Sequence, residues 1–180
     1  MNSERSNESY GYPYTYSPRG DRKWSFKKDQ SLTKGISLDF GSADFYFEID
    51  YDDLSNAGIG AVALKRFLQS RGLGKEDLRK VGVCAYEAEV NVVIHSTGTG
   101  NMYCFTNGRD IILLVLDNGI GIADLHAAMV EGFSTASDEV RDKGFGAGRG
   151  INNMKRFSDD FVMLSENGLG TRVEMRFRVA

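Results

Sequence analysis

The 180-residue chain is poor in the residues that build disulfide frameworks and multi-histidine metal centres. Its two cysteines, Cys84 and Cys104, lack the spacing of a metal site and are too few for a disulfide framework. Two histidines are too few for a centre built from several imidazoles. No apolar run approaches the roughly 20 residues of a membrane span, and no signal-peptide pattern opens the sequence. We therefore expect a reduced, cytoplasmic protein without a membrane partner.

Positive charge is not in excess either. The formal net charge is -3 and the isoelectric point is about 5.5. This balance argues against a basic surface that binds nucleic acid as the main function. With 41% hydrophobic residues, the chain can form one globular domain with a real core, and it is too short for two ordinary domains.

The first thirty-odd residues differ from the rest in composition. The stretch SYGYPYTYSPRG contains both prolines of the chain and places a tyrosine at every second position from Tyr10 to Tyr16. Alternation is typical of a strand, whereas the glycine, serine and proline content and the lack of aliphatic residues favour an unfolded tail. We predict a disordered tail over residues 1–35 and a folded domain over residues 36–180. The alternative is a strand that docks on a partner or pairs two copies.

The start of the domain has the pattern of one strand followed by two helices. Apolar residues alternate over residues 43–50, as in a half-buried strand. A helix with a cap at Asp53 or Ser55 is expected to run to about residue 70. Glycines then interrupt the pattern, and a second helix is expected over residues 76–96.

The remainder indicates more strands than helices. Residues 101–117 predict two strands joined at Asn107-Gly108, a dipeptide that tolerates the positive φ angles of a two-residue turn. The strand over residues 111–116 is almost wholly apolar, so we expect it to be central and covered at least in part on both faces. A short helix, a further helix and a strand–turn–strand are expected over residues 125–130, 151–157 and 161–179. The fold class predicted is a two-layer α/β sandwich, with helices on one face of a mixed, mostly antiparallel sheet.

Three polar side chains fall on one face of the second predicted helix. Glu87, Asn91 and His95 recur every four residues, which stacks them about 6 Å apart. A carboxylate, a carboxamide and an imidazole on an otherwise apolar helix are costly to bury without a purpose. The alternative is a solvated polar stripe, and His95 by itself fits a packed, hydrogen-bonding residue better than a catalyst.

A second motif, DNGIG, ends the apolar strand. Asp117 is followed by Gly119 and Gly121. An acceptor-only side chain at the mouth of an apolar sheet can recognise an exocyclic amine such as that of adenine. The glycines allow the backbone to turn tightly and to approach a flat ligand. The alternative is a plain strand-to-helix turn in which Asp124 caps the helix.

A third motif, GFGAGRG, occupies residues 144–150 and has glycines at alternate positions just before a helix. Such a loop presents unpaired N–H groups and the positive end of the helix dipole to an anion such as a triphosphate. It lacks the Gly-Lys-Ser/Thr ending of a P-loop and does not follow the first strand as a dinucleotide fingerprint does. Alone, it cannot be distinguished from a flexible hinge.

Taken together and in this order, the motifs resemble those of the GHKL ATP-binding family. The family's boxes match, in order, at Glu87 with Asn91, at residues 117–121, at residues 144–150 and at Gly170 with Thr171. The resemblance covers roughly residues 40–180. It implies that the chain binds ATP and Mg²⁺ in the fold of the histidine-kinase ATP-binding domain.

The resemblance also implies a role for each matched residue. Glu87 would be the general base that takes a proton from the attacking nucleophile, and Asn91 would ligate the Mg²⁺ that bridges the phosphates. Asp117 would accept a hydrogen bond from the adenine amino group, with Thr171 supporting that pocket. The other residues implied in ATP binding are His95, Gly119, Gly121, Ile122, Gly144, Gly146, Ala147, Gly148 and Arg149.

Within the family, the chain is most similar to the short, stand-alone serine/threonine kinases of bacterial partner-switching systems. Its first histidine, His95, lies inside the predicted ATP site, so a phosphoacceptor histidine ahead of the domain is not expected. Large transducer domains are not expected in a chain of this length either. Residues 131–137, EGFSTAS, resemble the lid of stress-response switch kinases. The resemblance implies a STAS-domain partner, with a sigma factor and a second copy of the chain as further candidates.

One position departs from the pattern of these kinases. They usually carry an arginine just before the glycine pair, where it reaches the terminal phosphate, whereas residues 144–145 here are glycine and phenylalanine. Arg141, Lys143 or Arg149 could substitute. A rival hypothesis is therefore a non-catalytic module, in which ATP orders a lid over residues 132–143 and the ordered lid binds a regulator such as a sigma factor. Slow ATP hydrolysis without a protein acceptor is a third.

Overall fold

The computed structural model describes residues 40–51 and 54–179. The tail predicted over residues 1–35 lies outside the described residues. The predicted cap residue Asp53 does so as well. Among the described residues, no helix combines the length and the apolar character that a membrane span requires.

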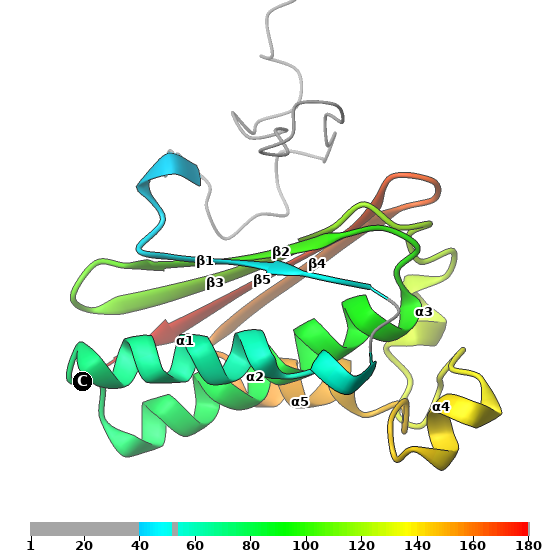
Figure 1. Ribbon diagram of the computed structural model, residues 1–180, viewed down its shortest axis with the longest axis horizontal. Coiled ribbons are helices and arrows are strands. Elements are labelled where there is room, and N and C mark those ends of the chain that lie inside the picture. Colours follow the sequence, from blue (N-terminus) through cyan, green and yellow to red (C-terminus); the bar gives the residue numbers. More distant parts are fainter. Residues whose placement is uncertain (1–39, 52–53, 180) are drawn as a thin grey trace, which may run out of the picture.

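The described chain forms two layers, a five-stranded sheet and three main helices that lie on one of its faces (Figure 1). The strands, all paired antiparallel in the order β1-β2-β3-β5-β4, are β1 Phe45–Ile49, β2 Gly100–Thr106, β3 Asp110–Asp117, β4 Asp160–Glu166 and β5 Gly170–Arg178. The α-helices are α1 Ile59–Ser70, α2 Lys75–His95, α3 Leu125–Ala128, α4 Asp138–Asp142 and α5 Gly150–Phe157. Short 3-10 helices, η2 and η3, occupy Phe40–Ser42 and Leu54–Asn56. This confirms the predicted α/β sandwich.

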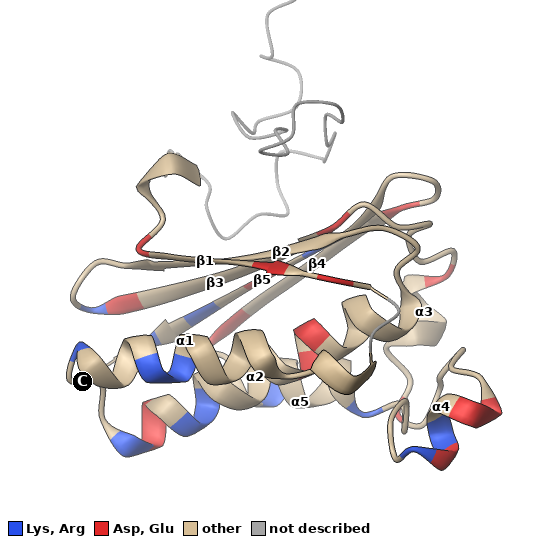
Figure 2. Ribbon diagram, viewed as in Figure 1, with Lys and Arg blue, Asp and Glu red and all other residues tan. Residues whose placement is uncertain are grey.

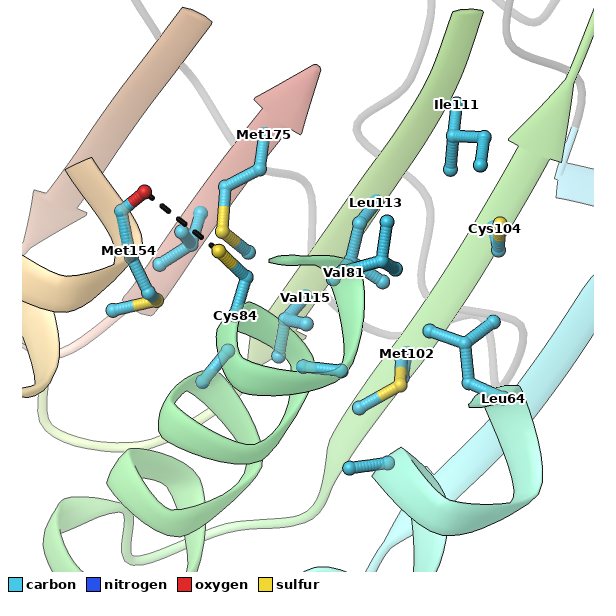
Figure 3. Close-up of a cluster of buried hydrophobic side chains, with 14 of the residues drawn as sticks. Leu64, Val81, Cys84, Met102, Cys104, Ile111, Leu113, Val115, Met154 and Met175 are labelled. Carbon is cyan, nitrogen blue, oxygen red and sulfur yellow. Dashed lines mark hydrogen bonds between the residues drawn. The ribbon is translucent and has the colours of Figure 1, made fainter. Parts of the chain in front are cut away.

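The main core lies between the helices and the sheet (Figure 3). Alternate residues of the central strands, among them Met102, Leu113 and Val115, face Val81 and Cys84 of α2. The Cys84 thiol is buried, and it donates a hydrogen bond of 3.7 Å to the backbone oxygen of Met154 on α5. Burial raises the pKa of this thiol to about 12, so Cys84 behaves as the small apolar helix residue that we expected.

The opposite face of the sheet is apolar as well. Leu114 and Leu116 of β3 join Tyr103 and Leu164 in a second buried cluster. Because the alternate residues Leu113 and Val115 of β3 lie in the main core, this strand is buried on both faces, as its apolar sequence predicts. The central position of β3 places its last residue, Asp117, at the edge of the core rather than in solvent.

Three local predictions differ from the structure. The helix α1 begins at Ile59 rather than after a cap near residue 53 or 55, because residues 54–56 form a separate 3-10 turn. The β2–β3 turn spans Asn107–Asp110, so that Gly108, with φ of 85°, is the first of two central residues. The polar stretch before Lys143 contains a helix, α4, that was not predicted.

Candidate functional site

A cavity of about 670 Å³ opens between α2, the turn after β3, and the segment that leads into α5. This volume is in the range of small-molecule and cofactor sites. The predicted site residues that line it are Glu87, Asn91, His95, Asp117, Gly121, Ile122, Gly144, Gly146, Ala147, Gly148, Arg149 and Thr171. Gly119 is the one predicted residue that does not line the cavity. The three separated motifs therefore meet around a single space.

The polar stripe of α2 faces this cavity. Because Glu87, Asn91 and His95 follow one another at four-residue intervals, the same helical face that points toward the cavity carries all three. The Glu87 carboxylate accepts a hydrogen bond of 2.6 Å from the side-chain amide of Asn153 on α5. These three polar side chains thus line a pocket and do not form a solvent-exposed face of the helix.

Asp117 is a buried acceptor at the end of β3. Only 9% of the residue is exposed, and its Oδ1 accepts a 2.8 Å hydrogen bond from the backbone N–H of Gly119. The hydroxyl of Ser96 lies 3.3 Å from the same oxygen. Burial raises the pKa of the Asp117 carboxyl, while hydrogen bonds from Gly119, Ser96 and Thr171 oppose that shift. A carboxylate held in this way can receive one further donor from a ligand in the cavity.

The turn after Asp117 requires glycine at position 121. Gly121 has φ of 75°, and a Cβ atom there would overlap the backbone oxygen of Glu166 in β4. The next residue, Ile122, donates its N–H to Ser165 Oγ over 2.7 Å, which fixes the turn to the β4–β5 hairpin. Asp124 also caps α3, because its side chain accepts from Ala127 N over 3.0 Å. The segment is both a capped strand-to-helix turn and one wall of the cavity.

The glycine loop packs against the segment that precedes it. Gly148 has φ of 68°, and its oxygen accepts a 3.0 Å hydrogen bond from Gly132 N. A Cβ atom at Gly148 would lie 2.5 Å from the carbonyl carbon of Gly132, so the two backbones require this close approach. The loop leads directly into α5, whose N-cap position is Arg149 and whose start no side chain caps within the described part of the chain. The start of α5 thus meets the cavity-lining loop.

The three basic residues that could contact the terminal phosphate lie in different surroundings. Arg149 lines the cavity, and its Nε lies 3.8 Å from Glu131 in an exposed pair. Arg141 instead donates to the backbone oxygen of Ser134 over 2.9 Å, and Lys143 pairs with Glu139. Neither of these two lines the cavity. Figure 2 shows the acidic and basic residues of α4 side by side.

His95 connects α2 with the segment between α3 and α4. Its Nδ1 lies 3.3 Å from the hydroxyl of Thr135. Burial lowers the pKa of the His95 imidazole, which favours the neutral ring. The ring is therefore a hydrogen-bonding wall of the cavity, as the sequence favoured, rather than a fixed positive charge.

Sequence reasoning did not identify several residues that shape the site. Ser96 contacts Asp117, and Thr135 contacts His95. Asn153 contacts Glu87. The position of Ser96 directly after the polar stripe was a signal that could have pointed to it. Asn153 carried no comparable signal, because its partner lies 66 positions away in the sequence.

The side-chain oxygens at one end of the cavity suit a divalent cation that is also bound by phosphates. No cluster of three or more histidine, cysteine or acidic side chains that could hold a metal occurs within residues 40–51 and 54–179. Glu87 and Asn91 nevertheless bring oxygen atoms to one end of the cavity, both within 3.4 Å of where a Cβ atom at Gly150 would lie. Mg²⁺ commonly binds through one or two protein oxygens, water and substrate phosphates. The side-chain oxygen of Asn91 fits that mode of binding as the protein ligand.

The chain is similar to several known proteins. The family model described as a histidine kinase-like ATPase domain matches residues 53–177. The anti-sigma F factor of Clostridium kluyveri is 29% identical over 125 residues, which cover 67% of this chain and 84% of the relative. That of Thermoanaerobacter sp. strain X514 is 33% identical over 104 residues, which cover 56% and 69%. The solved mycobacterial sensor histidine kinase MprB matches with a TM-score of 0.47 and 14% identity, over 75% of this chain and 98% of that chain.

Proposed function

The chain belongs to the histidine kinase-like ATPase (GHKL) family, and we propose that it is a cytoplasmic kinase that transfers the terminal phosphoryl group of Mg-ATP to a serine or threonine of a partner protein. One observation carries the proposal. Glu87, Asn91 and Asp117, which lie on two separate elements, line one cavity together with the glycine loop. This set offers an acceptor for an adenine amine and a backbone loop for a bound triphosphate.

The end of the site that would bind adenine is at Asp117. Its carboxylate accepts from the adenine amino group, and Thr171 supports the same pocket from β5. Gly119 acts through its backbone N–H, which holds Asp117 Oδ1, and not by lining the pocket. Gly121 and Ile122 form the wall beside the base and ribose.

The phosphate end of the site is the glycine loop and the start of α5. Backbone N–H groups of residues 146–148 and the positive end of the α5 dipole face the phosphates, whereas Gly144 N and Phe145 N donate to Arg141 O and Val140 O over 2.8 and 3.2 Å. Asn91 would hold the Mg²⁺ ion, which would supply charge neutralisation when bound. Arg149 lines the cavity at the end of this loop, and it takes the place of the arginine that is missing before the glycine pair.

In the transfer step the hydroxyl oxygen of the acceptor forms a bond to the terminal phosphorus. The bond between that phosphorus and the bridging oxygen breaks, and ADP leaves with the electron pair. Glu87 takes the hydroxyl proton on its carboxylate. Because such a transfer involves little covalent work by the protein, positioning and electrostatics supply most of the rate, and the base contributes about 10²–10⁴-fold.

The partner is inferred from the relatives. The similarity to anti-sigma F factors supports a sigma factor as one partner. A STAS-domain protein as the phosphorylated partner follows from the resemblance of the sequence motifs to those of partner-switching kinases. The test is a pull-down with the full chain in the presence of ATP, ADP or no nucleotide, followed by mapping of phosphosites on the recovered proteins. We expect a nucleotide-dependent partner with a phosphorylated serine or threonine. Recovery of partners that is independent of nucleotide, without phosphorylation, would exclude the proposal.

A second candidate is an ATP-gated binding module without catalysis. It is favoured by the contacts of Arg141 and Lys143, which tie these side chains to Ser134 and Glu139 and away from the cavity. Incubation with labelled ATP and candidate STAS-domain proteins distinguishes the two functions. Partner binding without transfer of label would favour the module.

A further inference from the structure

We propose that Asn153 is a positioning residue for Glu87, an inference that rests on the proposed role of Glu87 as the general base. The side-chain amide of Asn153 donates to Glu87 Oε1 over 2.6 Å. The two residues come from α5 and α2, the helices that meet at the phosphate end of the cavity. A hydrogen bond to a carboxylate is shorter and stronger than one between neutral groups, so this contact can fix the rotamer of Glu87.

The two carboxylate oxygens of Glu87 have different neighbours. Oε1 is the acceptor for Asn153, whereas Oε2 lies 3.1 Å from the point that a Cβ atom at Gly150 would occupy. A side chain at position 150 would therefore press on Glu87 Oε2 and would lie in ordinary contact with Asn91 Oδ1 at 3.4 Å. The carboxylate is held at one oxygen by the amide, and the other oxygen remains to accept a proton.

Asn153 also connects Glu87, the proposed general base, to the loop that would hold the phosphates. It lies three residues after Gly150, within the first turn of α5, and α5 follows the glycine loop without a break. The loop in turn bonds to the start of the lid segment through Gly148 O and Gly132 N. The lid segment, the glycine loop and Glu87 are thus linked through one short helix.

The chain offers a matched control next to this residue. Asn152 is also half-buried on α5 and has the same side chain, but within the described residues it does not share the hydrogen bond to Glu87. Replacement of either asparagine by alanine removes the same atoms from the same helix. A difference between Asn152→Ala and Asn153→Ala therefore reports the contact with Glu87 and not the general effect on helix stability.

A double-mutant cycle in the full chain tests the role, with ADP formation from Mg-ATP measured alone and with the recovered partner. We expect Asn153→Ala to lower kcat by about 10-fold or more, less than loss of the base itself, with nucleotide affinity changed by no more than about twofold. Asn152→Ala should leave both values unchanged. In the Glu87→Ala background, Asn153→Ala should have no further effect. Equal losses from the two asparagine variants, or additive losses in the double mutant, would overturn the proposal.

A measurement that needs no turnover separates this proposal from the proposed function. In the ¹⁵N-labelled chain, the side-chain amide signals of Asn153 should shift on Glu87→Ala, while those of Asn152 should not. Wild-type protein that forms no ADP would refute the kinase assignment, yet the shift would still support the contact. Asn153 signals that do not respond to Glu87→Ala would overturn the positioning role even if the wild-type chain is active.

Discussion

The backbone N–H of Gly119 donates to Oδ1 of Asp117 over 2.8 Å, at the point where the central strand leaves the core. The bond orients a buried carboxylate that would otherwise be costly to desolvate. A Cβ atom at position 119 would lie 2.5 Å from Ser96 Oγ and 2.8 Å from Asp117 Oδ1, which explains why glycine occupies this position although it does not line the cavity. The same carboxylate is the group that we assign to the adenine amine.

We predict that Asp117→Asn weakens ATP binding by roughly 10- to 100-fold. The neutral amide loses a charge-assisted hydrogen bond, which is worth about 1.5–3 kcal/mol, and its NH₂ group opposes the donors that now hold Oδ1. Titration with a fluorescent ATP analogue measures the effect. Asp110→Asn, at the other end of β3, is the control and should bind normally. Equal affinity in both variants would contradict the assignment of Asp117.

Replacement of Gly121 by alanine should destabilise the fold. The left-handed conformation costs a non-glycine residue about 1–2 kcal/mol, and overlap with Glu166 O adds to that penalty. Denaturant unfolding measures the change. Gly82→Ala in α2 is the control, because its Cβ meets only Lys65 at 3.7 Å, and it should stabilise the helix by up to about 1 kcal/mol. A Gly121→Ala variant as stable as the wild type would contradict this account of the turn.

Glu89 is predicted to stabilise the fold without a role in nucleotide binding. Its buried carboxylate accepts from Gly60 N and Ala61 N over 2.9 and 2.7 Å, which caps α1 from α2. Glu89→Ala leaves these N–H groups without an acceptor and should lower the free energy of unfolding by about 1–3 kcal/mol. The exposed Glu76→Ala should change it by less than about 0.5 kcal/mol. An ATP affinity that falls with Glu89→Ala while the fold persists would disagree with this role.

The predicted elements that the structure confirms are those with a strong local signal. The glycines at positions 72 and 74 separated α1 from α2, and the apolar run identified β3 and its central place. The order of motifs identified the residues that line the cavity. These signals are local because side-chain direction follows from helical or strand geometry alone.

The features that sequence could not reveal depend on contacts between distant residues. Local capping rules placed the start of α1 too early because its cap, Glu89, comes from another helix. The short helix α4 has no buried residues, so it lacks the apolar period that marks a helix. The hydrogen bond between Asn153 and Glu87 likewise follows only from the packing of α5 on α2.

Stability should depend on pH through His95. Because burial lowers the pKa of this imidazole in the folded state, the unfolded chain binds more protons just below pH 6.5. The free energy of unfolding should therefore fall as pH decreases from about 6.5 toward the folded-state pKa, and His95→Gln should reduce that slope. Thr135→Val keeps the His95 ring buried and should retain this pH dependence of the free energy of unfolding. A wild-type slope in His95→Gln would contradict the assignment.

The most direct test of the kinase proposal compares wild type with Glu87→Ala in one assay, with labelled ATP and the STAS-domain protein recovered in the pull-down. We expect the variant to bind ATP as tightly as the wild type but to transfer label more slowly by about 10²–10⁴-fold. Label transfer at the wild-type rate by Glu87→Ala would contradict the account.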